Sequence, residues 1–296
     1  MDRFQMTEQK LMRIGLLTVL VLLALCLLAA LILGVLHLTA PEPMQEPATD
    51  LSGSRLPYPT GEPSGGDASG EGTTSTGVVA HERLLAETAD GGQDYIDSMI
   101  FFGESTTAHL RSRGVLGDGK NTTQVWSDSS NTMMLDLNIL QKKIKYPASG
   151  VEMTVPEAAA IAKPKYIVLS FGVNGIYGFS KNHDLYRVSY GRLIDAIHQS
   201  SPETVVLLQT VYPVATNQTS FNDDAGVING YIDLLNQMLP DIAKKHDAYV
   251  VDTASCLADA RGFLNPSYAD SDGLHLNKAA YLTILNYLRT HSYELQ

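Results

Sequence analysis

An uncharged apolar run near the N-terminus is the feature that most constrains this chain. It extends from Ile14 to Leu38, and His37 is its only titratable side chain. About 20 apolar residues in a helix cross the hydrocarbon core of a bilayer, so we expect residues 14–38 to form one transmembrane helix. A helix buried in a protein core is less favoured, because the run is apolar on every face. A cleaved signal peptide is the stronger alternative, although its apolar region is normally shorter.

The charged residues on either side of this run predict its orientation. Residues 1–13 contain Arg3, Lys10 and Arg13, and the next basic residue after the run is Arg55. Basic residues that flank a membrane span are concentrated on its cytoplasmic side. We therefore expect a single-pass membrane protein with residues 1–13 in the cytoplasm and the rest of the chain, after the span, outside it.

Composition divides the remaining chain into a linker and a globular domain. Residues 39–80 are rich in Pro, Gly and Ser and have few large apolar side chains. They cannot bury enough surface to offset chain entropy and are predicted to be disordered. Residues 81–296 are long enough for one domain with a sizeable core. The formal net charge of −11 argues against nucleic acid as a partner, because phosphate binding needs a basic surface.

The two cysteines are not expected to form a disulfide. Cys26 lies inside the apolar run, whereas Cys256 lies near the C-terminus. Cys256 follows a strand-like run and has no partner motif of the kind that a catalytic thiol needs. A packing role is therefore preferred to a nucleophilic one.

Apolar runs alternate with helical patterns in the globular part. The runs predicted as strands are residues 98–102, 166–171, 204–211 and 248–251. They are continuous, as expected for strands covered on both faces. Helices are predicted over residues 185–199, 225–245 and 277–291, with Pro240 expected to break or kink the second and Asn277 to cap the third. This order predicts a three-layer α/β/α sandwich with a central parallel sheet.

Three short motifs place reactive side chains after predicted strands or before the last helix. They are Phe-Gly-Glu-Ser-Thr-Thr with Ser105, Ser-Phe-Gly-Val-Asn-Gly with Asn174, and Asp-Gly-Leu-His-Leu-Asn with Asp272 and His275. Each motif alone is better explained as a turn or a helix cap. Together they supply what acyl transfer by serine requires: a base, a carboxylate that orients the base, and an amide donor for the oxyanion.

In this order the three motifs resemble those of the SGNH/GDSL hydrolase superfamily, and the resemblance covers residues 94–296. It implies a flavodoxin-like fold in which Ser105 is the nucleophile, His275 the general base and acid, and Asp272 the residue that orients His275. It also implies that Asn174 and the backbone N–H of Ser105 donate to the oxyanion. We expect no cofactor, and no metal either, because Asp272 and His275 have no second histidine nearby in the sequence.

The chain departs from the family pattern at several positions. Glu104 stands where the first motif has Asp, and Thr106 where it has Leu; neither position carries proton transfer, so these changes are discounted. Gly175 replaces an Asp of the third family block, which predicts a less firmly held Asn174 loop. The glycine of the second block, an oxyanion donor, has no clear match. Asn131 is the candidate, because Asn tolerates left-handed backbone conformations.

The resemblance and the expected location together predict an extracytoplasmic serine esterase. The expected substrates are short-chain O-acyl esters, such as O-acetyl groups on cell-wall carbohydrate, and the partners are an ester-bearing small molecule or a cell-wall glycan, with the membrane contacted through residues 14–38. An O-acyltransferase, a lipase or a thioesterase would use the same residues. A catalytically silent glycan-binding module is the alternative of another class.

Aromatic residues near the motifs are candidates for substrate contact. Trp126, Tyr177 and Phe179 follow the proposed site motifs, and aromatic faces stack well on sugar rings. Trp126 and Tyr177, together with Gly172, are therefore candidate substrate-binding residues; at Gly172 the missing side chain allows close backbone approach. Packing within the loops is the competing interpretation.

Overall fold

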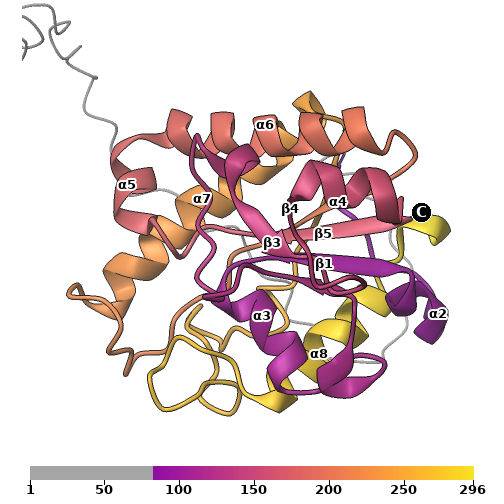
Figure 1. Cartoon of the computed structure of the whole chain (residues 1–296). Helices are drawn as coiled ribbons and strands as arrows, with labels where there is room; N and C mark the ends of the chain where they lie inside the picture. Colours follow the sequence, from indigo (N-terminus) through magenta and orange to yellow (C-terminus); the bar gives the residue numbers. More distant parts are fainter. Residues whose placement is uncertain (1–82) are drawn as a thin grey trace, which may run out of the picture. The chain divides into compact units, whose positions relative to one another are not determined.

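The computed structural model of the protein describes residues 83–296, which form the domain drawn in colour in Figure 1. The predictions of a cytoplasmic segment at 1–13, a transmembrane helix at 14–38 and a linker at 39–80 lie outside the described residues. Within residues 83–296, no helix combines the length and the apolar character needed to cross a membrane.

A five-stranded parallel sheet forms the centre of the domain. Its strand order is β2-β1-β5-β6-β7, and every neighbouring pair is parallel. The strands are β1 (Met99–Gly103), β2 (Val125–Trp126), β5 (Tyr166–Ser170), β6 (Val205–Gln209) and β7 (Tyr249–Val251). The four predicted strands are confirmed as β1, β5, β6 and β7. The two-residue strand β2 is too short to give a pattern in the sequence.

Helices cover both faces of this sheet (Figure 1). On one face lie α4 (Val155–Ala162), α5 (Ile176–Lys181), α6 (His183–Ser200) and α7 (Ala225–Lys245). On the other lie α2 (Gly92–Asp97), α3 (Ser105–Ser112) and α8 (Lys278–Arg289). A separate hairpin pairs β3 (Lys143–Lys145) with β4 (Glu152–Thr154). The arrangement confirms the predicted three-layer α/β/α sandwich.

Alternate residues of each strand enter two different cores. In β1, Phe102 packs into the core beneath α6 and α7, whereas Phe101 packs into the core beneath α8. In β5, Leu169 likewise packs into the first core and Val168 into the second. A strand whose two faces are both buried needs apolar side chains at every position. This explains the continuous apolar runs in the sequence.

The predicted helices are found as α6, α7 and α8. Asn277 caps α8, with its side-chain oxygen accepting the backbone N–H of Ala280 at 3.2 Å. The expectation that Pro240 breaks the second helix is wrong, because α7 continues through it. A proline removes one hydrogen bond from a helix. Here the buried residues Leu239 and Ile242, on either side of Pro240, keep α7 packed on the sheet.

Candidate active site

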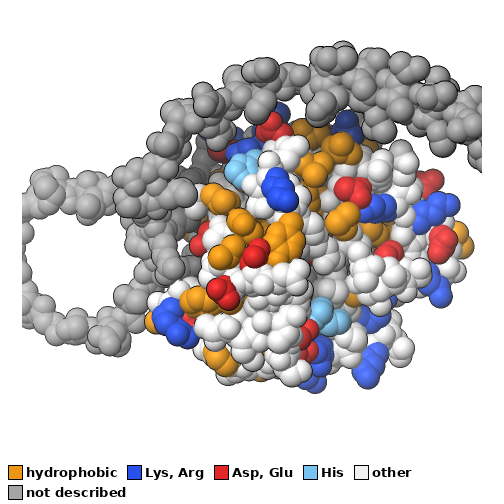
Figure 2. All heavy atoms as spheres, turned by 90° about the vertical axis from the view of Figure 1, so that its left-hand side faces the viewer, with side chains coloured by type: hydrophobic (Ala, Val, Ile, Leu, Met, Phe, Trp, Pro, Cys, Tyr) orange, Lys and Arg blue, Asp and Glu red, His pale blue; other side chains and the backbone are white. Residues whose placement is uncertain are grey.

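The three sequence motifs meet at one edge of the sheet, where the parallel strands end. The first follows β1 and opens α3, the second follows β5, and the third precedes α8. Figure 2 views this side of the molecule, on which histidine and acidic side chains reach the surface among hydrophobic ones. In open α/β sheets, the carboxyl ends of the strands are the usual place for a functional site.

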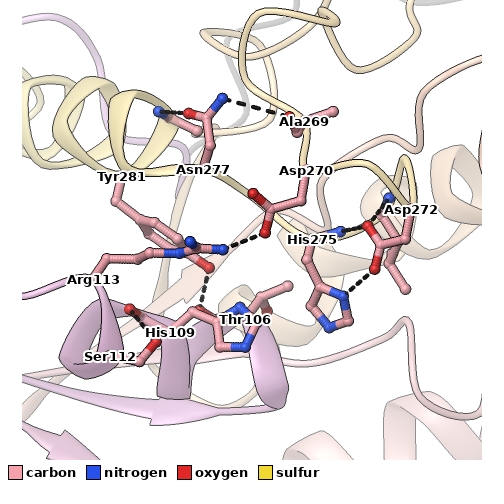
Figure 3. Close-up of polar contacts among 12 residues, drawn as sticks. Thr106, His109, Ser112, Arg113, Ala269, Asp270, Asp272, His275, Asn277 and Tyr281 are labelled. Atoms are coloured by element: carbon pink, nitrogen blue, oxygen red, sulfur yellow. Dashed lines mark hydrogen bonds and ion pairs between the residues drawn. The ribbon is translucent and has the colours of Figure 1, made fainter.

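Ser105, His275 and Asp272 form a chain of hydrogen bonds at this edge. Ser105 Oγ lies 3.1 Å from His275 Nε2. His275 Nδ1 lies 2.5 Å from Asp272 Oδ2 (Figure 3). The side chain of His275 remains 28 % exposed, so a substrate can reach it from solvent. The structure thus brings together the three residues that the sequence predicted as a triad.

The charge on Asp272 determines which nitrogen of His275 carries the proton. Burial raises the pKa of Asp272, but hydrogen bonds from the His275 ring and from the backbone N–H groups of His275 and Leu274 outweigh it and lower that pKa overall. Both backbone groups donate to Asp272 Oδ1, at 2.9 and 3.0 Å. An ionised carboxylate can only accept, so Nδ1 of a neutral His275 donates to it. Nε2 is then free to accept the Ser105 hydroxyl proton.

Glu104, next to Ser105, holds the loop that contains Asn174. Its Oε1 accepts the backbone N–H of Gly172 at 2.9 Å, and its Oε2 accepts those of Val173 and Asn174 at 3.1 and 3.0 Å. The side chain is buried, and burial raises the pKa of Glu104 to about 7 against the opposing effect of the three donors. The Glu at this position, which the sequence analysis discounted, therefore has a structural role. Glu104 connects the first motif to the second.

Asn174 and Ser105 carry the N–H groups that the sequence predicted as oxyanion donors. One N–H of its side-chain amide donates to the carbonyl of Met133 at 3.2 Å, and an amide carries two such donors. Ser105 is the first residue of α3, and the first N–H groups of a helix have no carbonyl partner within the helix. The Asn174 amide and the Ser105 N–H are the two candidate donors. Their role in stabilising an oxyanion remains a prediction.

Two glycines shape the same loop. Gly175 has φ +109° and precedes α5, and a Cβ there would lie 3.2 Å from the Phe179 ring. Glu104 accepts three backbone N–H groups of this loop, and a looser hold at Gly175 stays a prediction. Gly172 does not support the predicted substrate contact. It is buried, its N–H is taken by Glu104, and a Cβ would lie 2.5 Å from Val211.

The proposed second-block donor, Asn131, does not fit that role. It has the expected left-handed backbone, with φ 56°. However, its N–H donates to the carbonyl of Asp128 at 3.2 Å, its side chain accepts from Ser127, and the residue is exposed. The left-handed conformation therefore closes a turn of residues 128–131. Asn131 is therefore not an oxyanion donor.

The aromatic candidates have different environments. Trp126 is 1 % exposed in β2, where it packs edge-on against Tyr146, so the predicted substrate contact is wrong. Phe179 is also buried, in α5. Tyr177 is partly exposed, and its ring packs edge-on against Phe221 at 6.1 Å. Of the aromatic residues named from the sequence, Tyr177 alone keeps substrate contact as a prediction.

The loop after β6 holds the third motif in place. Thr219 N–H donates to the carbonyl of Asp272 at 3.0 Å, and Ala215 N–H donates to that of Gly273 at 2.8 Å. Gly273 has φ +68°, and a Cβ there would lie 2.7 Å from the backbone of Gln218. The triad loop and the loop after β6 therefore pack backbone against backbone. No sequence pattern indicated this contact.

Cys256 lies away from the triad residues and is partly buried. Burial, with the nearby Asp252 as a further cause, raises the pKa of its thiol to about 12. A thiol with such a pKa stays protonated near neutrality and is a poor nucleophile. This agrees with the packing role preferred from the sequence.

The fold and the site define the class of protein. A parallel sheet with Ser105 at the start of the first following helix, Asn174 after the next strand of the sheet, and Asp272 and His275 before the last helix is the arrangement of the SGNH/GDSL hydrolases. The model of the GDSL-like lipase/acylhydrolase family matches residues 101–282. The chain belongs to this family, and membership places it among the acylhydrolases, which hydrolyse esters.

Solved structures with a similar fold have low sequence identity to the chain. A Streptococcus pneumonia protein described as a platelet activating factor is 17 % identical with a TM-score of 0.48, over 71 % of this chain and 86 % of that one. A carbohydrate esterase family 3 protein from Talaromyces cellulolyticus is 21 % identical with a TM-score of 0.34, over 45 % and 59 %. A peptidoglycan O-acetylesterase is 13 % identical with a TM-score of 0.36, over 45 % and 38 %. No curated protein matches the sequence.

Proposed function

We propose that the protein is a serine esterase in which Ser105 is the nucleophile, His275 the general base and acid, and Asp272 the residue that orients His275. The observation that carries this proposal is the hydrogen-bond chain from Ser105 Oγ through both nitrogens of His275 to Asp272. The lowered pKa of Asp272 leaves Nε2 as the acceptor, which is the state that a general base requires.

The reaction consists of two acyl transfers. Ser105 Oγ attacks the ester carbonyl carbon while its proton passes to His275 Nε2. The tetrahedral intermediate collapses, the bond to the alcohol oxygen breaks, and the alcohol leaves with the proton from Nε2. Water then attacks the acyl-serine, again giving a proton to His275. The acid leaves, and the proton returns to Ser105 Oγ.

Donors near Ser105 supply the electrostatic part of catalysis. The oxyanion forms at the N-terminal end of α3, where backbone N–H groups and the helix dipole favour negative charge. The free N–H of the Asn174 amide and the N–H of Ser105 are the proposed donors. Loss of one such donor typically lowers kcat by roughly 10²- to 10³-fold. Glu104 contributes by holding the backbone of the Asn174 loop.

The proposed substrates are short-chain O-acyl esters, with O-acetyl groups on cell-wall carbohydrate as the leading candidate. The support is the family, which hydrolyses esters, and the uncharged run from Ile14 to Leu38, which predicts an extracytoplasmic location for the domain. Outside the cell, wall glycans and wall-linked polymers carry such esters. Tyr177 and Phe221, partly exposed beside the Asn174 loop, are the side chains proposed to meet the sugar.

The test is hydrolysis of p-nitrophenyl esters of increasing acyl length, and of O-acetylated glycans, by the purified full-length chain. We expect turnover that is highest with acetate and falls with chain length. Ser105→Ala should lower kcat by roughly three orders of magnitude or more. A fluorophosphonate should label the wild type at Ser105 and leave the Ser105→Ala variant unlabelled.

The outcomes separate the competing functions. Acyl-enzyme that forms but passes its acyl group to an added sugar and not to water would identify an acyltransferase. A preference for long acyl chains would identify a lipase or thioesterase. A folded protein that neither turns over esters nor reacts with the fluorophosphonate would leave glycan binding without catalysis, and the esterase proposal would be rejected.

A further inference from the structure

One face of α3 carries three polar side chains at successive turns. Ser105, His109 and Arg113 are four residues apart, and this spacing places side chains on the same side of a helix. All three contact the segment that contains Asp270 and His275. Ser105 binds the His275 ring and His109 packs on it. Arg113 forms an ion pair with Asp270 (Figure 3).

The His109 ring gives His275 a packing contact in addition to its two triad hydrogen bonds. Ser105 and Asp272 bind the two nitrogens of His275, at the edge of the ring. The centroids of the His109 and His275 rings are 4.8 Å apart, with the planes inclined at 47°. Hydrogen bonds at the two nitrogens alone leave the ring able to shift by small rotations about its Cα–Cβ and Cβ–Cγ bonds. A second ring packed beside it opposes that motion.

The contact between the two rings is held by bonds around it. Asp270, the ion-pair partner of Arg113, donates its backbone N–H to the carbonyl of His275 at 2.7 Å. The hydroxyl of Tyr281, from α8, donates to the carbonyl of Thr106 at 2.7 Å. Helix α3 is therefore tied to the triad segment at its C-terminal end through Arg113, and to α8 at its N-terminal end through Thr106. His109 lies between these two ties.

The chemistry of His109 suits contact through the ring and not through a hydrogen bond. Its Nδ1 is buried and has no hydrogen-bond partner among the described residues. Burial, followed by the nearby charges of His275 and Arg113, lowers the pKa of His109, and the carboxylates of Asp270 and Asp272 oppose this less strongly. The ring is therefore neutral near neutral pH. It can lie beside the imidazolium that His275 becomes during the reaction without repelling it.

We propose that His109 is a positioning residue whose ring packs against His275 and keeps Nε2 aimed at Ser105 Oγ while that nitrogen takes and returns a proton. This inference rests on the proposed esterase function. It assigns to a residue outside the triad the task of holding the orientation of His275. The ring of residue 109 carries this role, and its nitrogen atoms do not.

The test compares three substitutions of His109 in the full-length chain. His109→Phe keeps a flat ring, His109→Gln keeps polarity without a ring, and His109→Ala removes both. His198, in the last turn of α6 on the opposite face of the sheet, provides the control substitution His198→Ala. For p-nitrophenyl acetate, we expect His109→Ala and His109→Gln to lower kcat by roughly tenfold to a hundredfold with KM little changed. His109→Phe and His198→Ala should stay within about threefold of the wild type.

A second measurement does not depend on activity. The proton between His275 Nδ1 and Asp272 should give a resolved downfield proton resonance in the wild type and in His109→Phe. We expect that resonance to broaden or disappear in His109→Ala and His109→Gln, while circular dichroism shows them folded. If His109→Ala does not fold, the comparison of His109→Phe with His109→Gln tests the proposal.

Two results would overturn the inference. One is wild-type kcat and an unchanged resonance in folded His109→Gln; the other is a loss in His109→Phe as large as in His109→Gln. An inactive wild type whose resonance still responds to His109 as described would instead reject the esterase proposal and leave the positioning contact established. The two failures are therefore distinguishable.

Discussion

The Oε2 atom of Glu104 lies 3.0 Å from the backbone nitrogen of Asn174, so the residue before the proposed nucleophile binds the residue proposed to stabilise the oxyanion. The two are 70 positions apart in the sequence and belong to different motifs. This hydrogen bond fixes one half of the site relative to the other. Its contribution can be measured.

Substituting Glu104 should impair catalysis to a degree that depends on how many acceptor oxygens remain. In Glu104→Gln, the amide NH2 must face at least one of the three backbone N–H donors, so the Asn174 loop shifts and kcat falls by roughly 10²-fold. Glu104→Asp keeps two acceptor oxygens and should retain more activity than the Gln variant. Steady-state kinetics on p-nitrophenyl acetate tests this order. Equal activity of the Gln variant and the wild type would show that the three hydrogen bonds are dispensable.

The same carboxyl group should make stability depend on pH. The pKa of Glu104 is raised from 4.5 to about 7 in the folded protein, so the folded state holds its proton more tightly than the unfolded state. Its contribution is therefore most favourable below pH 4.5 and is lost as the pH rises toward 7, by on the order of 3 kcal/mol. Relative to Glu104→Gln, the wild type should lose free energy of unfolding over this interval. Urea unfolding of both proteins at several pH values measures the difference, and parallel curves would contradict the raised pKa.

Replacing Asp272 by Asn should leave the geometry of the site intact but move the His275 proton from Nδ1 to Nε2. The backbone N–H groups of Leu274 and His275 donate to Oδ1, so the amide oxygen stays there and the NH2 group faces Nδ1. The His275 proton must then move to Nε2, which can no longer accept from Ser105. We expect kcat to fall by on the order of 10⁴-fold with KM little changed. Asp184→Asn, at a side chain 88 % exposed on the surface, is the control and should have wild-type kinetics.

Gly273→Ala should distort the triad loop. Its φ of +68° is unfavourable for a residue with a side chain, and the Cβ would lie 2.7 Å from Gln218 backbone atoms. We expect a loss of stability of about 1–3 kcal/mol and a lower kcat, because Asp272 and His275 flank the strained position. Gly230→Ala is the matched control: it lies in α7 with open space around it and should stabilise the protein by about 0.5–1 kcal/mol. Thermal unfolding and kinetics of both variants test the contrast, and a fully active Gly273→Ala would show that the loop can yield.

Much of the fold was predictable because the sheet is buried on both faces. Apolar strands and amphipathic helices then leave a clear pattern, and a parallel sheet brings the residues that follow its strands to one edge. This is why Ser105, Asn174 and His275 could be placed near one another without coordinates. The prediction that Trp126 contacts substrate was wrong because a two-residue strand leaves no pattern in the sequence. Its burial involves Tyr146, a neighbour 20 positions further along the chain.

The support around the triad was harder to predict because it consists of bonds to the backbone. The role of Glu104 depends on three N–H groups that any sequence would possess. Asn131 has the predicted left-handed conformation, but its N–H is used within its own turn. His109 did leave a signal, since it lies four residues after Ser105 on one helix. That signal acquires meaning only once the position of His275 is known.

The order of the triad residues along the chain also affects how the enzyme is made. Ser105 precedes His275 by 170 residues, and ribosomes add about 5–20 residues per second. For roughly 10 to 30 seconds of synthesis the proposed nucleophile therefore exists without its proposed base. A chain whose synthesis stops before Asp272 has Ser105 at the start of α3 but lacks the residues proposed to activate it. On the proposed mechanism, Ser105 therefore has no general base until His275 has been made.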